Sequence, residues 1–289
     1  MQKLIWVVVG LLLLTPSGFA MVTIGHRGVM QDYKPMGPCH LQLQSEKHLF
    51  IENTLAAAAE GFRNFDMIEV DIQVTLDGHL VLFHDRHLKK NYGVDKSVSK
   101  LTLGQLKELN PKTCYLDKKG QRPLVKQGRG EWTLFQEVLA AYPGKPILLN
   151  PKFSPGPGVE ALAKVLMPLS KDTLNSFRYL GDADVYKLLK KQIPYLGARF
   201  STIREAGPCK LDVLKNLKDI SKLPSSCRKM PGVVFLMKEW DWAIKRNPNM
   251  SRLFKEAGIM TLVWGPVSKS NLEDLKKSLV DYVLLDRPL

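Results

Sequence analysis

The stretch MIEVDIQVTLDGHLVLFHD occupies residues 67–85 and determines how this part of the chain folds. Its first half alternates apolar residues with Glu69 and Asp71, which are two apart and therefore project from the same side of a strand. The Asp-Gly pair at 77–78 is a strong signal for a tight turn between antiparallel strands. We therefore predict a strand with two carboxylates on one side, followed by a β-hairpin that returns His84 over the same end.

Apolar runs and stretches of helical periodicity alternate along the rest of the chain. The predicted strands cover residues 22–26, 67–74, 147–150, 173–177, 195–200, 232–236, 259–263 and 282–285. The predicted helices cover residues 53–61, 133–142, 159–166, 182–191, 211–217, 250–257 and 272–279. Eight short strands alternating with helices are typical of a (β/α)8 barrel, and a doubly wound open sheet gives the same local pattern. The periodicity favours the barrel and leaves the open sheet as the alternative.

The 289 residues suit a single α/β barrel domain, predicted to cover residues 21–289. No internal repeat and no linker rich in Gly, Ser or Pro divides the chain. Two stretches break the alternation of strands and helices, residues 29–51 and residues 84–130. Both are predicted to be insertions over one face of the barrel, in addition to the small hairpin after the second strand.

The first twenty residues have the layout of a secretory signal. Lys3 precedes an unbroken apolar run at 4–14, and the small residues Gly18 and Ala20 follow. This order predicts cleavage after Ala20 and export, either to a periplasm or out of the cell. An uncleaved anchor is the alternative, although a run of eleven apolar residues is short of the roughly 20 that span a bilayer.

Four cysteines, Cys39, Cys114, Cys209 and Cys227, would meet an oxidising environment after export. Four cysteines permit two disulfides in three connectivities. Cys209 and Cys227 enclose a short segment and are the easiest pair to join. The cysteine spacing shows no zinc motif, so we predict two disulfides.

The composition is that of a globular protein with a basic surface. Apolar residues make up 45% of the chain, which argues against a disordered protein, and the formal net charge is +14. A basic surface attracts phosphate-bearing substrates and anionic membrane surfaces. The lysines are scattered without interleaved aromatic residues, so nucleic acid is not an expected partner.

Side chains suited to phosphate chemistry follow the first two strands. His26 can move a proton, and Arg27 can hold two phosphate oxygens. Two carboxylates as close as Glu69 and Asp71 repel each other unless a cation lies between them, and an oxygen-only pair favours Ca²⁺ or Mg²⁺. The alternative is that one carboxylate pairs with arginine and the other is solvated. His84 would add a second imidazole beside this group.

Together these segments resemble the glycerophosphodiester phosphodiesterase family. The shared motifs, in chain order, are His26-Arg27-Gly28, Glu52-Asn53-Thr54, Glu69-Val70-Asp71, Thr75-Leu76-Asp77-Gly78, His84-Asp85, Val263-Trp264 and Asp286-Arg287-Pro288. The first five in the same order are far more specific than any one of them. The resemblance covers residues 23–289 and implies a TIM barrel.

The resemblance also implies a reaction and roles for individual residues. The expected substrate is a small glycerophosphodiester or a lipid headgroup. Its own glycerol hydroxyl next to the phosphate attacks the phosphorus and forms a cyclic phosphate. Hydrolysis of that cyclic phosphate releases glycerol 3-phosphate. The implied roles are His26 and His84 as general base and acid, Arg27 and Lys152 as phosphate ligands, Glu69 and Asp71 as ligands of a divalent metal, Glu52 as a supporting residue and Trp264 in the substrate pocket.

The sequence departs from the family at residue 150. The family strand ends Glu-x-Lys, whereas this chain has Asn150 before Pro151 and Lys152. An Asn oxygen can bind Ca²⁺ or Mg²⁺ but brings no charge, so a metal site with two carboxylates and weaker affinity is predicted. Two other interpretations are that Glu46 or Asp32 supplies the missing acid, and that the protein binds its ligand without efficient turnover.

Two alternative functions remain open at this point. The first is an enzyme like phospholipase D that acts on a lysophospholipid or a sphingolipid and stops at the cyclic phosphate. The second is a non-catalytic protein that binds phosphodiesters, which Asn150 would favour. The presence of both His26 and His84 argues against a binder, because binding alone needs no pair of proton-transfer groups.

Overall fold

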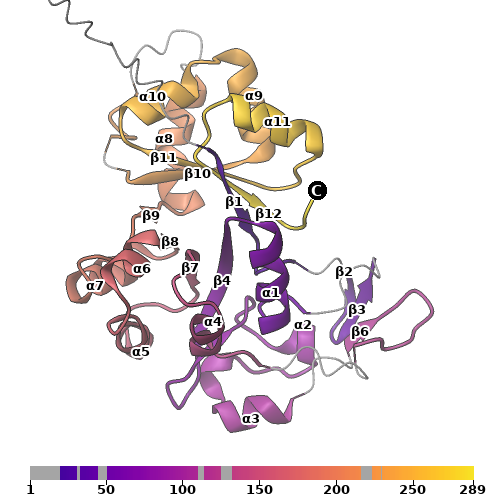
Figure 1. Ribbon diagram of the computed structural model, residues 1–289. Coiled ribbons are helices and arrows are strands. Elements are labelled where there is room, and N and C mark those ends of the chain that lie inside the picture. The colour runs from indigo at the N-terminus through magenta and orange to yellow at the C-terminus, as the bar shows by residue number, and fades with distance from the viewer. Residues whose placement is uncertain are drawn as a thin grey trace, which may run out of the picture.

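The computed structural model describes residues 20–30, 33–44, 51–109, 114–124, 132–215, 223–228 and 230–289. Eight parallel strands form a nearly closed barrel in the order β10-β11-β12-β1-β4-β7-β8-β9 (Figure 1). Their bounds are β1 Val22–Gly25, β4 Met67–Val74, β7 Ile147–Pro151, β8 Arg178–Leu180, β9 Arg199–Phe200, β10 Gly232–Leu236, β11 Met260–Trp264 and β12 Tyr282–Leu285. Ser201 N donates to Gly232 O at 2.8 Å and joins the end of β9 to β10. The predicted α/β barrel is confirmed, and the open sheet is not.

Helices surround the barrel in Figure 1. The longer ones are α1 Leu55–Asn64, α5 Pro157–Leu166, α7 Ala183–Gln192, α8 Ile203–Lys215, α9 Met237–Arg246 and α11 Lys269–Lys277. The shorter ones are α2 Lys89–Tyr92, α3 Leu103–Glu108, α4 Phe135–Ala141, α6 Lys171–Ser176 and α10 Met250–Glu256, with a 3-10 turn at Val98–Lys100. Thr54 begins α1 by accepting a hydrogen bond from Ala57 N, which satisfies one of the free amides at the helix end.

Apolar side chains fill the lower part of the barrel interior. Leu148, Phe200 and Leu262 are fully buried in one cluster to which most of the barrel strands contribute. Such packed layers make a barrel interior a core and not a channel. Because side chains on a strand alternate in direction, residues two positions further along β1, β4, β7 and β11 project into the same interior nearer its open end.

One predicted strand, 173–177, was wrong. Residues Lys171–Ser176 form α6, and the strand β8 follows at Arg178–Leu180. Ser170 caps the helix by accepting a hydrogen bond from Thr173 N. The buried residues Leu174 and Phe177 are three apart, which is the spacing of one helical face and not of one strand face.

The predicted strand at 195–200 and the segment after β10 also differed from expectation. Only Arg199–Phe200 is strand. Gly197 lies against the carbonyl of Phe177, where an added Cβ would be 1.7 Å from the oxygen. Helix α9 was not predicted. Its Trp240 is buried against Phe235, which is core packing, so this tryptophan lies outside the cavity described below.

The β-hairpin after the second barrel strand is confirmed. Strand β5 (Leu80–Leu82) pairs antiparallel with β4, and the turn between them contains Gly78 with φ of 85°. Positive φ is the conformation that glycine adopts without steric cost. The hairpin brings the chain back to the end of β4, where the polar residues of the site begin.

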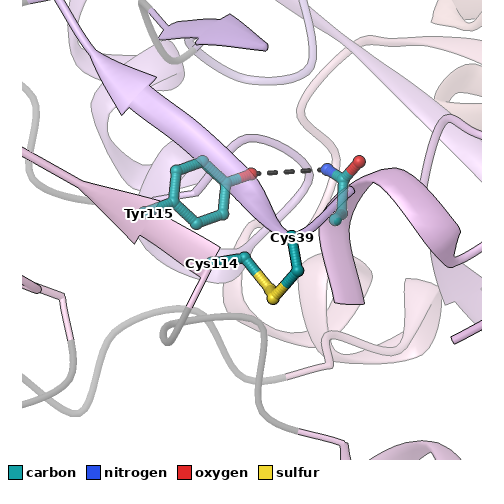
Figure 2. The surroundings of a disulfide bond; sticks show 4 residues. Cys39, Cys114 and Tyr115 are labelled. Atoms are coloured by element: carbon teal, nitrogen blue, oxygen red, sulfur yellow. Dashed lines mark hydrogen bonds between the residues drawn. A yellow bond between two sulfur atoms is a disulfide. The ribbon is translucent and has the colours of Figure 1, made fainter. Parts of the chain in front are cut away.

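The two insertions meet in a small second sheet at one side of the barrel (Figure 1). Strands β2 (Tyr33–Gly37) and β3 (His40–Leu43) are antiparallel, and β6 (Tyr115–Leu116) pairs parallel with β3. A Cys39–Cys114 disulfide joins the two insertions beside Tyr115 (Figure 2). A second disulfide joins Cys209 and Cys227, so both predicted disulfides are confirmed.

The predicted signal segment, residues 1–19, lies outside the described residues. Within the described ranges, no helix is long and apolar enough to span a bilayer.

Candidate active site

A cavity of about 340 Å³ opens at the carboxyl ends of the barrel strands. Its lining residues are His26, Glu69, His84, Asn150, Lys152, Leu180, Gly181, Thr202, Arg204, Val234, Trp264 and Leu284. Six of the nine predicted site residues are in this lining. The other three, Arg27, Glu52 and Asp71, are buried beside it. The structure therefore brings together residues that are distant in sequence, at the face where TIM barrels carry their active sites.

His26 follows β1 and is almost fully buried. Its Nδ1 lies 2.7 Å from Asp286 Oδ1, a residue that follows β12. The ring also meets the Trp264 indole edge-on, with centroids 5.6 Å apart. A carboxylate on Nδ1 fixes the ring orientation and leaves Nε2 as the nitrogen that can accept or release a proton.

His84 follows the hairpin strand β5 and has the same kind of partner. Its Nδ1 lies 2.7 Å from Asp85 Oδ1. The loop itself is held by the Gln73 amide, which donates to the carbonyl oxygens of Phe83 at 3.0 Å and Asp85 at 2.7 Å. The hydrogen bond with His84, together with the Lys90 ammonium, lowers the pKa of Asp85 below its usual range. The cavity thus has two imidazoles, each oriented by its own carboxylate.

Glu69 and Asp71 lie side by side on β4 with no exposed surface. The Asn150 amide donates from Nδ2 to both, at 2.7 Å to Glu69 Oε1 and 3.1 Å to Asp71 Oδ1. Asp71 also contacts Lys152 Nζ at 2.9 Å and Arg27 Nε at 3.3 Å. Every oxygen of this carboxylate pair therefore has a partner from the protein.

The pKa values of the two carboxyl groups are shifted in opposite directions. Burial alone would raise the pKa of Asp71, but Lys152 and Arg27 outweigh it and lower the pKa to about 2. Burial and the neighbouring Asp71 charge raise the pKa of Glu69. Asp71 is therefore the member of the pair whose charge the neighbouring cations stabilise, and Glu69 is the member whose charge is more costly to maintain.

Arg27 has an unusual backbone and a buried side chain. Its φ is 56°, which is uncommon for a residue with a Cβ and is typical of functional sites. The conformation is held by the Arg27 N–H, which donates to Glu69 Oε2 at 2.9 Å. The guanidinium lies between Asp71 and Glu52, 3.3 Å from each, and does not line the 340 Å³ cavity. In these contacts the guanidinium faces buried carboxylates, and the phosphate-binding role that the family resemblance implies for Arg27 stays a prediction.

Arg204 and Asn53 are site residues that the sequence reasoning did not single out. Arg204 lies in the first turn of α8, directly after β9, and lines the cavity with Lys152. The sequence signal that could have identified Arg204 is its position shortly after a barrel strand. Asn53 Nδ2 donates to Asp71 Oδ2 at 2.8 Å, and its backbone has φ of 58°, a conformation that Asn tolerates well.

Oxygen atoms of the kind that hold a divalent cation gather around Asn150. One oxygen each of Glu69 and Asp71 converges on the Asn150 amide, and a rotated amide would add its own oxygen to give three oxygen ligands. No cluster of three or more His, Cys, Asp or Glu side chains suited to a metal occurs among the described residues. Asp32 and Glu46, the alternative sources of a third acid, lie outside them.

Residues 26–289 match the model of the "Glycerophosphoryl diester phosphodiesterase family". Lysophospholipase D GDPD1 of Mus musculus is 30% identical over 150 residues, which are 50% of this chain and 47% of that protein. A glycerophosphodiester phosphodiesterase of Caldanaerobacter subterraneus is 27% identical over 232 residues, 73% of this chain and 88% of that protein. The chain thus spans about half the length of the lysophospholipase D relatives it matches.

Solved structures agree with the fold. A phosphodiesterase from Oleispira antarctica, in complex with the product sn-glycerol-3-phosphate, has a TM-score of 0.63 at 19% identity and covers 93% of this chain and 94% of its own. A glycerophosphodiester phosphodiesterase from Agrobacterium tumefaciens has a TM-score of 0.62 at 18% identity, with 93% and 97% covered. At this identity the similarity shows that the folds are shared.

Proposed function

The chain belongs to the glycerophosphoryl diester phosphodiesterase family, and we propose that it hydrolyses glycerophosphodiesters to an alcohol and glycerol 3-phosphate. The observation that carries the proposal is the pair of imidazoles at one cavity, His26 and His84, each with its Nδ1 on a carboxylate. Phosphodiester cleavage needs one group that removes a proton and one that supplies a proton, and this pair provides both.

In the proposed reaction His26 acts as base and His84 as acid. His26 Nε2 accepts the proton of the substrate hydroxyl that attacks phosphorus, and His84 Nε2 protonates the departing alcohol oxygen. The product of this step is a cyclic phosphate. In the second step the roles are exchanged: His84 takes a proton from the attacking water, and His26 returns one to the oxygen released when the ring opens.

The remaining residues of the cavity bind and orient the substrate. Lys152 and Arg204 are the cations in the lining and are placed to attract the phosphate. Trp264 stands against His26 and offers an apolar face to the alcohol group. Arg27 and Glu52 are assigned a supporting role, because their contacts keep the buried carboxylates in place.

A divalent cation, Ca²⁺ or Mg²⁺, is proposed to bind at Glu69, Asp71 and Asn150. When bound, it would neutralise charge on the phosphoryl oxygens. The chain offers two carboxylates there, one of which already contacts Lys152. Ligand charge sets affinity for such cations, so the proposed site is weak.

Replacing Asn150 by glutamate is expected to tighten Ca²⁺ binding by roughly tenfold or more, because it adds a third carboxylate to the ligand set. The measurement is a calorimetric titration of EDTA-treated protein with CaCl₂. Asn150→Gln is the matched control, since it has the same length without the charge. Equal Ca²⁺ affinity of Asn150→Glu and Asn150→Gln would show that no cation binds between these residues.

A lysophospholipid is the second candidate substrate. A cavity of about 430 Å³ adjoins the site, shares Trp264 with it and is lined in part by Leu236, Met237 and Pro266. The lining also includes Lys238, Asp241 and Asn271, and its apolar side chains offer a place for an aliphatic chain on the substrate. The matched relatives named lysophospholipase D point to the same substrate class for those proteins.

The proposed activity is tested by glycerol 3-phosphate release from glycerophosphocholine, with EDTA and with Ca²⁺ or Mg²⁺ titrated back. We expect turnover that EDTA abolishes and that millimolar cation restores. Choline release from lysophosphatidylcholine, measured in parallel, tests the second candidate. Absence of turnover on both substrates at every cation concentration would leave a phosphodiester-binding protein as the better interpretation.

Export of the protein remains a proposal that two observations support. Both disulfides are compatible with an oxidising compartment, and the leader layout precedes the domain proposed at 21–289. Contact with an anionic membrane surface would follow from the net charge of +14.

A further inference from the structure

A series of contacts runs outward from His84 to the two insertions. Asp85, the partner of His84, lies 3.3 Å from Lys90 Nζ. The same ammonium donates to the Tyr33 hydroxyl at 3.0 Å, and Tyr33 in turn donates to Glu52 Oε1 at 3.4 Å. Tyr33 belongs to the first insertion and Lys90 to the second, so the carboxylate that orients His84 is held by residues outside the barrel strands.

Helix α2, which carries Lys90, has only four residues and cannot keep its place by helix formation alone. Two residues of this helix are hydrogen-bonded to the segments that the Cys39–Cys114 disulfide joins (Figure 2). The Cys39 N–H donates to the carbonyl oxygen of Lys90 at 2.9 Å. Asn91 Nδ2 donates to the hydroxyl of Tyr115, the residue after Cys114, at 3.4 Å.

Both sets of contacts reach the loop that carries His84 and Asp85. His84, Asp85, Glu52 and Asn91 line one small enclosed cavity together with Arg27. Glu52 and Asn91 are both at least nine-tenths buried. A displacement of α2 would therefore reach His84 by two routes, through Lys90 and Asp85 and through the residues packed around this cavity.

We propose that Lys90 and Tyr33 are positioning residues for His84 and that the Cys39–Cys114 disulfide keeps them in place. This inference rests on the proposed function, in which His84 transfers the proton. Lys90 holds Asp85, Asp85 holds Nδ1 of His84, and the orientation of Nε2 toward the substrate follows. Small errors in the placement of a catalytic group reduce turnover strongly, while substrate binding at Lys152 and Trp264 is unaffected.

The first test is Lys90→Met, which keeps the aliphatic stem and removes the charge. We expect kcat to fall about tenfold with KM unchanged, since only the proton transfer is misaligned. Lys90→Arg should recover most of the loss because it restores the cation. Lys89→Met is the matched control on the same helix, whose ammonium faces the exposed Asp95 instead.

The pH profile separates positioning from a general loss of structure. Asp85 has a lowered pKa, caused by His84 first and also by Lys90. Removal of Lys90 withdraws one cause of that lowered pKa, so the contact between Asp85 and the His84 Nδ1 proton, followed by nuclear magnetic resonance, should be lost at a higher pH in Lys90→Met than in Lys89→Met. An unchanged kcat in Lys90→Met, with no such difference in pH, would overturn the proposal.

The second test compares the two disulfides. Cys39→Ser/Cys114→Ser is expected to lower kcat by a factor similar to Lys90→Met, and the two changes combined should be no worse than either alone. Cys209→Ser/Cys227→Ser should leave kcat unchanged. Additive losses would overturn the link between the disulfide and Lys90. Should the Cys39→Ser/Cys114→Ser protein not fold, Tyr33→Phe carries the same expectation.

Nuclear magnetic resonance keeps this test independent of turnover. The Nδ1 proton of His84, assigned by its loss in His84→Ala, should be observable downfield in the parent protein and in Lys89→Met. It should exchange faster in Lys90→Met. If neither substrate is turned over but this pattern is seen, the positioning contacts stand and the proposed activity fails. A His84 proton that is unaffected in Lys90→Met overturns the positioning role.

Discussion

Replacing His84 by alanine is expected to lower kcat on glycerophosphocholine by roughly 10²–10⁴-fold, the usual contribution of a positioned proton-transfer group. His84 lines the cavity with its Nδ1 bound by Asp85, so its other nitrogen is the group that meets the substrate. Steady-state kinetics with saturating cation measures the effect. His26→Ala should lose a comparable factor, because the proposed reaction uses the two imidazoles in the same steps.

His87→Ala is the control for this prediction. His87 lies three residues further along the same loop, is exposed and does not line the 340 Å³ cavity. Its replacement should leave kcat within about twofold of the parent value, since substitutions of exposed residues outside the cavity have small effects. A His84→Ala protein that retains more than a tenth of the parental kcat would remove His84 from the mechanism.

Asp71→Ala is expected to lower the free energy of unfolding by about 3–5 kcal/mol. The substitution removes a fully buried carboxylate and leaves Lys152 and Arg27 without their shared counter-charge. Urea unfolding at pH 7 in EDTA measures the loss. Asp95→Ala is the matched control, because its partner Lys89 is exposed and such surface pairs contribute about 0–1 kcal/mol.

The stabilisation from Asp71 should also depend on pH. Its pKa is lowered to about 2 in the folded protein, against about 3.9 for an unperturbed Asp. A lowered pKa contributes stability that is complete above the unperturbed value and is lost as the pH falls between the two values. The difference between the parent and Asp71→Ala should therefore shrink below about pH 4. A difference below about 1 kcal/mol at pH 7 would contradict the buried ion pair.

The bounds of three barrel strands were predicted correctly from their apolar runs, and two of these runs, 67–74 and 282–285, have polar residues on both sides. The ranges 67–74, 232–236 and 282–285 agree with β4, β10 and β12 at both ends. The range 173–177 failed because so short a segment was assigned from its apolar residues, although Leu174 and Phe177 are three apart, as on a helical face. The Ser170 cap was a second local signal for the helix.

The residues of the site could be predicted from the sequence because they end barrel strands or follow them directly. His26, Glu69, Asp71 and Asn150 continue the inward-facing positions of buried strands, so their convergence followed from the two-residue period and the parallel order. Their partners were not readable. Asp286 is 260 residues from His26, and nothing local in either segment indicates that they meet.

Strand periodicity favoured the barrel, and the order of the motifs indicated the family and the residue types that line the cavity, because both can be read from the amino-acid sequence alone. The tertiary structure alone decided what each charge faces. Arg27 is buried between carboxylates and Asn150 donates to two of them, while Lys90 reaches Asp85 from the second insertion, which a disulfide joins to the first. Electrostatic roles depend on distances of a few ångströms between distant segments, and only folding sets those distances.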